Sequence, residues 1–310
     1  MGKYMPEGRL LESEKNSAYL KSLSNLSEAF SRGEILEGRA VSCNQNHDLI
    51  VDLGFCTGLI PRSEGAIGID DGETKDIALI SRVGKSVCFK IVGFNTENEE
   101  VLPILSRRQC QMDCMKNYVK TLKKGDIIEV RVTHLEPFGA FCDIGCGIIA
   151  LMPIDCISVS RISHPKDRFY KGQYIKAVVK AFDEMGRITL SHKELLGSWE
   201  ENARNFQSGE TVSAIVRSIE PYGIFAELAP NLAGLAETKE GVAVGDRASV
   251  FIKSLIPEKM KVKLIIVDSF KEEKQTIKEP EYFVSAPHID KWTYSPENAK
   301  KQIETVFLDQ

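Results

Sequence analysis

The chain has 310 residues, of which 43% are hydrophobic and 27% are charged; these are ordinary values for globular proteins, and the length suits two or three domains. No apolar run approaches the roughly 18–20 residues that span a bilayer, and charges throughout the first thirty residues are unlike a signal peptide. We therefore expect a cytoplasmic protein with no membrane partner. The net charge of −4 argues against a grip on duplex DNA along a basic surface.

The N-terminal part is predicted to hold a charged, partly helical extension, residues 1–32, and a first β-rich segment, residues 33–107. This segment contains 7 basic and 12 acidic residues, a net charge of −5. Later segments have aromatic residues at positions where this one has Asn46 or His47 and Ile50. We therefore expect the first segment to be a degenerate copy that binds a polyanion poorly.

The second segment, residues 122–197, has the pattern of a small barrel. Apolar residues Ile128, Val130 and Val132 alternate with polar ones, which is typical of a half-buried strand. Further strands are predicted from the same patterns at 140–144, 148–152, 174–182 and 187–191. Five short strands in about 70 residues favour a closed barrel, because closure removes exposed sheet edges.

The second and third segments are internal repeats. The stretch GDIIEVRVTHLEPFGAFCDIGCGIIALMP starts at Gly125, and GETVSAIVRSIEPYGIFAELAPNLAGLAE starts at Gly209 and matches it without a gap at an offset of 84 residues. A fainter copy starts at Gly33. The third repeat is assigned to residues 208–268, and the fold class is predicted as all-β, with three tandem five-stranded barrels.

Short helices are predicted between the barrels, at residues 108–121 and 198–207. Around the second linker, apolar residues recur at helical spacing at Leu196, Trp199, Ala203 and Phe206. We therefore expect Trp199 to pack in a core and not to stack on a base.

The segment Phe138-Gly139-Ala140-Phe141 is the most informative motif. Two aromatic residues three apart on a regular strand face opposite sides. A glycine between them permits a bulge, which could bring both rings to one face. Paired exposed rings form a stacking platform worth roughly 1–3 kcal/mol per base. The alternative is that one or both rings fill the barrel core.

A second group lies in the last turn of the same repeat, in the sequence DEMGRITLSHK. With Ile188 and Leu190 pointing inward, Arg187 falls on the solvent face, where it can pair with phosphate or stack on a base. Asp183 can orient it or accept a hydrogen bond from a base or a ribose. The alternative is a solvated turn with a surface ion pair of little energetic weight.

Together, FGAF and DEMGRITLSHK resemble the RNA-binding domain repeated in the bacterial ribosomal protein S-one family. The resemblance covers roughly residues 33–268. It implies OB-fold barrels that bind single-stranded RNA through Phe138, Phe141, Asp183 and Arg187. The histidine of the family pattern falls at Pro153, a departure that we expect to weaken the groove without abolishing it.

The other two repeats match the family pattern less well. The third keeps Tyr222, Phe225 and Lys261, but Glu237 occupies the histidine position, so we expect a secondary RNA contact. In proteins of the family, the first repeats dock onto the ribosome. The first repeat here is similar to those, which makes the small ribosomal subunit its expected partner.

The C-terminal tail, residues 269–310, contains the aromatic residues Tyr282, Phe283, Trp292 and Tyr294. These aromatics predict that the tail docks onto the third barrel or onto a partner.

The spacing of the cysteines is not that of a typical zinc site. Cys110 and Cys114, like Cys142 and Cys146, are separated by three residues. Zinc knuckles typically have two, so we expect small buried side chains and no metal.

We therefore predict a monomeric protein that binds single-stranded RNA, specifically mRNA, in translation. No catalytic residues and no cofactor are predicted, because phosphate loops, nucleophile elbows and HExxH motifs are absent. The competing hypothesis is a protein-interaction adaptor or ribosome-associated regulatory factor with little RNA binding of its own.

Overall fold

The computed structural model of the chain describes residues 3–97, 100–271 and 277–308. Residues 1–2 of the predicted extension, 98–99 of the first repeat, and 272–276 and 309–310 of the tail lie outside the described residues. In the described part, no helix is both long and apolar enough to span a bilayer.

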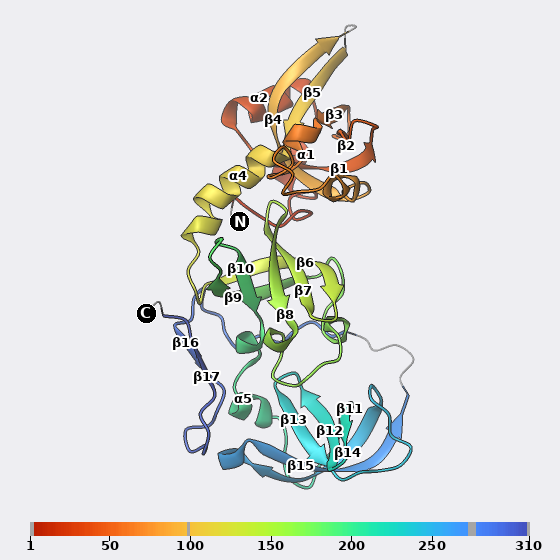
Figure 1. The fold of residues 1–310 in the computed structure, drawn as a ribbon, viewed down its shortest axis with the longest axis vertical. Coiled ribbons are helices and arrows are strands. Elements are labelled where there is room, and N and C mark those ends of the chain that lie inside the picture. The colour runs from red at the N-terminus through yellow and green to blue at the C-terminus, as the bar shows by residue number, and fades with distance from the viewer. Residues whose placement is uncertain (1–2, 98–99, 272–276, 309–310) are drawn as a thin grey trace. The chain divides into compact units, whose positions relative to one another are not determined.

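Three closed five-stranded barrels follow one another along the chain, which confirms the predicted fold class (Figure 1). The strands of the first are β1 Leu36–Cys43, β2 Leu49–Asp52, β3 Thr57–Ile60, β4 Ser86–Glu97 and β5 Glu100–Ser106. Those of the second are β6 Ile127–Glu136, β7 Gly139–Gly145, β8 Ile148–Pro153, β9 Tyr174–Phe182 and β10 Ile188–Ser191. Those of the third are β11 Thr211–Glu220, β12 Gly223–Ala229, β13 Leu232–Ala236, β14 Arg247–Ile256 and β15 Lys261–Phe270.

The three barrels share one topology, as expected of tandem OB-folds. In each, the first strand lies between the second and the fourth, and the third strand neighbours the fifth. The pairing of the third strand with the fifth is parallel in all three. The alternation of β6 is also as predicted, because Ile128, Val130 and Val132 are buried and their neighbours are partly exposed.

Short helices flank and connect the barrels. The extension forms α1 Glu14–Tyr19 and α2 Leu23–Arg32. The first linker forms α4 Arg107–Asn117 and a 3₁₀ turn, Val119–Thr121. The second forms a 3₁₀ turn, Lys193–Leu196, and α5 Trp199–Ala203, which starts at a capping box made by Ser198 and Glu201. The remaining helical segments are α3 Ile77–Ile80 and the 3₁₀ turns Arg62–Glu64, Ile154–Cys156, Pro165–Asp167 and Pro257–Lys259.

The contacts within the chain define two units. The first comprises residues 1–122 with 143–149, and the second comprises 123–142 with 150–310. One contact of residues 143–149 with the rest of the first unit is the hydrogen bond that the buried Asp143 accepts from the backbone N–H of Glu7 at 2.8 Å. Glu7 in turn forms a buried ion pair with Arg107, with 2.6 Å between Nε and Oε1. Burial raises the pKa of Asp143 to about 7.

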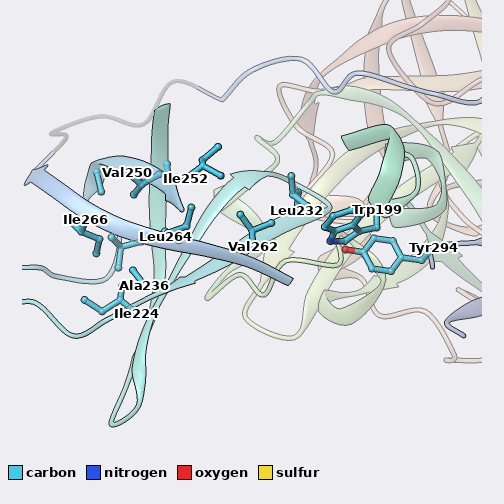
Figure 2. Close-up of a cluster of buried hydrophobic side chains, with 14 of the residues drawn as sticks. Trp199, Ile224, Leu232, Ala236, Val250, Ile252, Val262, Leu264, Ile266 and Tyr294 are labelled. Atoms are coloured by element: carbon cyan, nitrogen blue, oxygen red, sulfur yellow. The ribbon is translucent and has the colours of Figure 1, made fainter. Parts of the chain in front are cut away.

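The tail docks within the second unit, on the second barrel, on the linker and on the core of the third barrel. Its strands β16 Lys291–Thr293 and β17 Glu304–Val306 form a two-stranded sheet. Trp199 is buried, as predicted, and donates its backbone N–H to the carbonyl of Tyr294 at 2.9 Å. Figure 2 shows the Trp199 and Tyr294 side chains close together beside the apolar residues of the third barrel. Trp292, Tyr294 and Phe307 all belong to this buried cluster.

The predicted burial of the cysteines is also confirmed. In the described part of the chain, Cys110, Cys114, Cys142 and Cys146 are all buried, and none of them forms a disulfide. These cysteines pack in the core as small apolar side chains.

Candidate nucleic-acid interface

Two aromatic rings lie together on the surface of the second barrel. Phe138 is 57% exposed, and Phe141 is half-buried on β7. Their ring centroids are 5.9 Å apart and their planes are perpendicular. The structure therefore brings these two predicted site residues into edge-to-face contact, a favourable arrangement for aromatic pairs.

The local backbone explains how the rings meet. Phe138 lies in the turn before β7, so the glycine begins the strand and does not interrupt it as the bulge interpretation assumed. A Cβ on Gly139 would lie 2.5 Å from the carbonyl oxygen of Met152, so only glycine allows this approach to β8. The carbonyl of Phe138 accepts the N–H of Ile154 at 2.9 Å, which fixes the turn.

The last turn of the barrel presents a cation, as predicted. Asp183 Oδ1 accepts the backbone N–H of Arg187 at 2.8 Å, and Asp183 Oδ2 lies 2.6 Å from Arg187 Nε. These hydrogen bonds, led by the one from the backbone, lower the pKa of Asp183. The Arg187 side chain stays 74% exposed. Its turn precedes β10, which is separated from β7 by β8.

Sequence reasoning missed His134, which lies beside the ring pair. Its ring centroid is 6.4 Å from that of Phe141, and the side chain is exposed on β6. Strict alternation after Val132 would place His134 in the core. In the third repeat, the register of β11 shifts between Val216 and Ser218, and Ser218 is equivalent to His134 at the offset of 84. Such a shift exposes a residue that alternation assigns to the interior.

The third barrel repeats the ring pair. Tyr222 is 69% exposed, and its ring centroid is 6.2 Å from that of Phe225, again at nearly a right angle. Both rings line a groove of about 610 Å³. The charged side chains in the lining are Glu237, Lys253, Lys261 and Lys263.

The groove thus contains Lys261 and two lysines that the sequence analysis did not select. Lys261 and Lys263 alternate with buried residues along β15, a period-two signal that could have identified the second one. Lys253 reaches the groove from β14. With three lysines against one glutamate, the groove favours an anionic ligand.

The first barrel differs from the other two at the position of the ring pair. Asn46 and His47 lie in the turn between β1 and β2, and Ile50 is half-buried on β2. His47 adopts a left-handed backbone conformation with φ of 65°, and its Nδ1 lies 3.3 Å from Asp76 Oδ2. No aromatic pair occupies this position among the residues placed in the structure.

Comparison with known proteins points to one domain family. Residues 121–193 match the S1 RNA binding domain. The small ribosomal subunit protein bS1 of Staphylococcus aureus (strain COL) is 30% identical over 245 residues, which are 77% of this chain and 58% of that protein. The bS1 homolog of Bacillus cereus is 28% identical over 307 residues, 94% of this chain and 77% of the homolog. The chain thus spans little more than half the length of the staphylococcal protein.

Two solved structures are also similar. A multidomain protein with nucleic acid binding domains from Streptococcus pneumoniae matches 76% of this chain and 74% of its own, at 16% identity and a TM-score of 0.25. GSP13 from Bacillus subtilis matches 23% of this chain and 55% of its own, at 25% identity and a TM-score of 0.22.

Proposed function

We propose that this chain, which matches the S1 RNA binding domain at residues 121–193 and has bacterial bS1 proteins among its relatives, holds single-stranded mRNA during translation in the cytoplasm. The observation that carries the proposal is the repeated ring pair. Phe138 and Phe141 in the second barrel and Tyr222 and Phe225 in the third have the same edge-to-face geometry. Successive bases can stack on exposed rings regardless of sequence.

The cations complete the proposed RNA site. Arg187 beside Asp183 in the second barrel, and Lys261 with Lys253 and Lys263 in the third, would contact phosphates. His134 is added to the site because its ring adjoins Phe141. In this function the protein acts as a monomer, without a cofactor and without catalysis.

The first barrel has a separate role in this proposal. Its net charge of −5 and the non-aromatic residues at its ring-pair positions make it unsuited to RNA, so we assign it to docking on the small ribosomal subunit. If the second and third barrels did not bind RNA, the whole chain would be a protein-interaction adaptor. A direct measurement of RNA binding therefore distinguishes the RNA-binding function from the adaptor function.

A fragment experiment tests this division. A fragment of residues 108–310 is expected to bind an unstructured oligoribonucleotide nearly as tightly as the full chain, and residues 1–107 hardly at all. The fragment keeps the tail because Trp292 and Tyr294 belong to the core of the third barrel. Binding is measured by fluorescence anisotropy, with circular dichroism showing that each piece is folded. Equal affinity of the two pieces would contradict the proposal.

Arg187 provides a second test. Arg187→Ala is expected to weaken RNA binding less than loss of the rings, and to flatten the slope of log affinity against log salt by about 0.7, the value for one phosphate on a single strand. Anisotropy titrations at three salt concentrations measure both quantities. Lys301→Ala, an exposed change in the tail, is the control. An unchanged slope for Arg187→Ala would show that this side chain contacts no phosphate.

We further propose that the chain has three modules, at residues 33–107, 122–197 and 208–268. Limited proteolysis with mass spectrometry checks them, because early cuts in the middle of residues 125–191 would contradict the second module.

A further inference from the structure

A small charged pocket lies in the second unit, between the second and third barrels. It has a volume of about 240 Å³, below the roughly 300–1,000 Å³ of pockets that enclose a drug-sized ligand. Its charged lining comes from separate parts of the chain: Asp167 and Arg168 before β9, Arg217 on β11, Glu227 on β12, Arg247 on β14, and Lys278 in the tail. This volume is sufficient for a phosphate group.

The floor of this pocket is a buried ion-pair network. The side chains of Arg168, Arg217 and Glu227 are 9%, 6% and 5% exposed. Glu227 Oε2 lies 2.5 Å from Arg168 Nη2 and 2.8 Å from Arg217 Nε. Glu227 Oε1 also accepts a hydrogen bond from Arg217 Nη2 at 3.2 Å. One carboxylate therefore compensates two buried guanidinium groups.

Among the described residues, the buried part of this network has two guanidinium groups and one carboxylate. Asp167, the second acid, is 3.4 Å from Arg217 and more exposed than the three buried groups. Nε of Arg168 is buried and has no hydrogen-bond partner among the described residues. Burial lowers the pKa of Arg168, and the neighbouring Arg217 lowers it further, against the opposing effect of Glu227. A buried cation without full compensation is costly, and a bound anion would remove that cost.

Two further cations line the pocket. Arg247 donates from Nη1 to the hydroxyl of Ser213 at 3.3 Å, and Lys278 is exposed. Among the described residues, the lining thus has four cationic and two acidic side chains. Arginine guanidinium groups match the geometry of phosphate oxygens.

The position of the pocket connects it to the RNA groove of the third barrel. Glu227 in the pocket and Phe225 in the groove are two residues apart on β12. Alternate residues of a strand face the same side. A strand whose base stacks on Phe225 therefore passes close to the pocket.

We propose that this pocket binds a phosphate group, and that the group is a backbone phosphate of the single-stranded RNA held by the third barrel. The choice of RNA as the source rests on the proposed function. The phosphate site itself rests on the ion-pair network and can be tested without RNA.

Two rim variants test the site without removing the buried network. Arg247→Glu and Lys278→Glu each reverse one charge, and Lys278 is exposed, so its variant is expected to fold. Lys301→Glu, exposed in the tail, is the matched control. Inorganic phosphate is added at constant ionic strength, with chloride as the reference. It should raise the Tm of the wild type and of Lys301→Glu saturably, because a ligand of the native state stabilises it. Both rim variants should lose this shift.

The same proteins are then titrated with an unstructured oligoribonucleotide. Each rim variant should bind several-fold more weakly, with a slope of log affinity against log salt that is smaller by about 0.7. Tyr222→Ala should weaken binding while leaving the slope and the phosphate-dependent Tm shift unchanged, because it removes a ring and no charge.

The outcomes separate the parts of the proposal. An identical response of all variants to inorganic phosphate would overturn the site, since a general salt effect acts on every variant alike. A phosphate shift lost in the rim variants, with unchanged RNA slopes, would mean that free phosphate or a nucleotide is the ligand and would overturn the RNA assignment. If wild type bound phosphate saturably but no RNA, the proposed function would fail while the phosphate site stood.

Discussion

Replacing Phe138 and Phe141 together by alanine is expected to weaken RNA binding by about 2–4 kcal/mol, if each ring holds one base. This corresponds to a loss of roughly 30- to 900-fold in affinity. The slope of log affinity against log salt should stay nearly unchanged, because no phosphate contact is removed. The measurement is an anisotropy titration with an unstructured oligoribonucleotide at three salt concentrations.

The control must separate lost stacking from lost folding. Phe141 is half-buried, so circular dichroism and thermal unfolding must show that the variant retains its barrel. Phe55→Ala is the matched control, because Phe55 is also a strongly exposed phenylalanine but belongs to the first barrel. It should bind RNA as the wild type does. A folded double variant with wild-type affinity would make the adaptor function the leading one.

Trp199→Ala is expected to lower the free energy of unfolding of the second unit by about 3–5 kcal/mol, the usual cost of truncating a large buried aromatic residue. Trp199 is 2% exposed and packs with the third barrel and with Tyr294 of the tail. Equilibrium urea unfolding measures the change. The chain has two tryptophans, and the other, Trp292, lies in the same cluster, so its fluorescence reports unfolding in the variant.

A milder substitution at the same position tests the packing explanation. Trp199→Phe keeps most of the buried apolar area, so its cost should be clearly smaller than that of alanine. Because the cluster contains residues of linker, barrel and tail, fluorescence and far-UV circular dichroism should follow one transition for these parts. A loss below about 1 kcal/mol for Trp199→Ala would contradict the assigned core role.

Local patterns in the sequence were sufficient for the barrels. Strand β9, Tyr174–Phe182, has the predicted bounds. Strands β8 and β10 differ from the predicted strands by one residue at one end, and β7 differs by one residue at each end. Alternating apolar residues specify a strand wherever one face is buried, and glycines mark the turns. The stretch that begins at Gly125 matches the stretch that begins at Gly209, so the same fold was predicted for the third barrel. Equal patterns at a fixed offset specify equal folds.

The ring pairs were also accessible from sequence, but only as candidates. FGAF and its counterpart at Tyr222 predicted two neighbouring rings, and the centroid distances of 5.9 and 6.2 Å agree. The route to this geometry was wrong, because Phe138 lies in the turn before β7. Alternation assumes a regular strand, and it fails where a strand starts or where its register shifts, as at His134.

Only the tertiary structure decided which residues far apart in the chain come together in one site. Lys253 and Lys263 join Tyr222 in one groove because β14 and β15 pair beside β13. Arg168 and Glu227 are separated by 59 residues, yet they share a partly buried hydrogen bond. The pairing of such side chains depends on strand register and on how two barrels pack, and no local pattern contains either. The sequence therefore determined three barrels and their rings, and packing determined the charged pocket and the place of the tail.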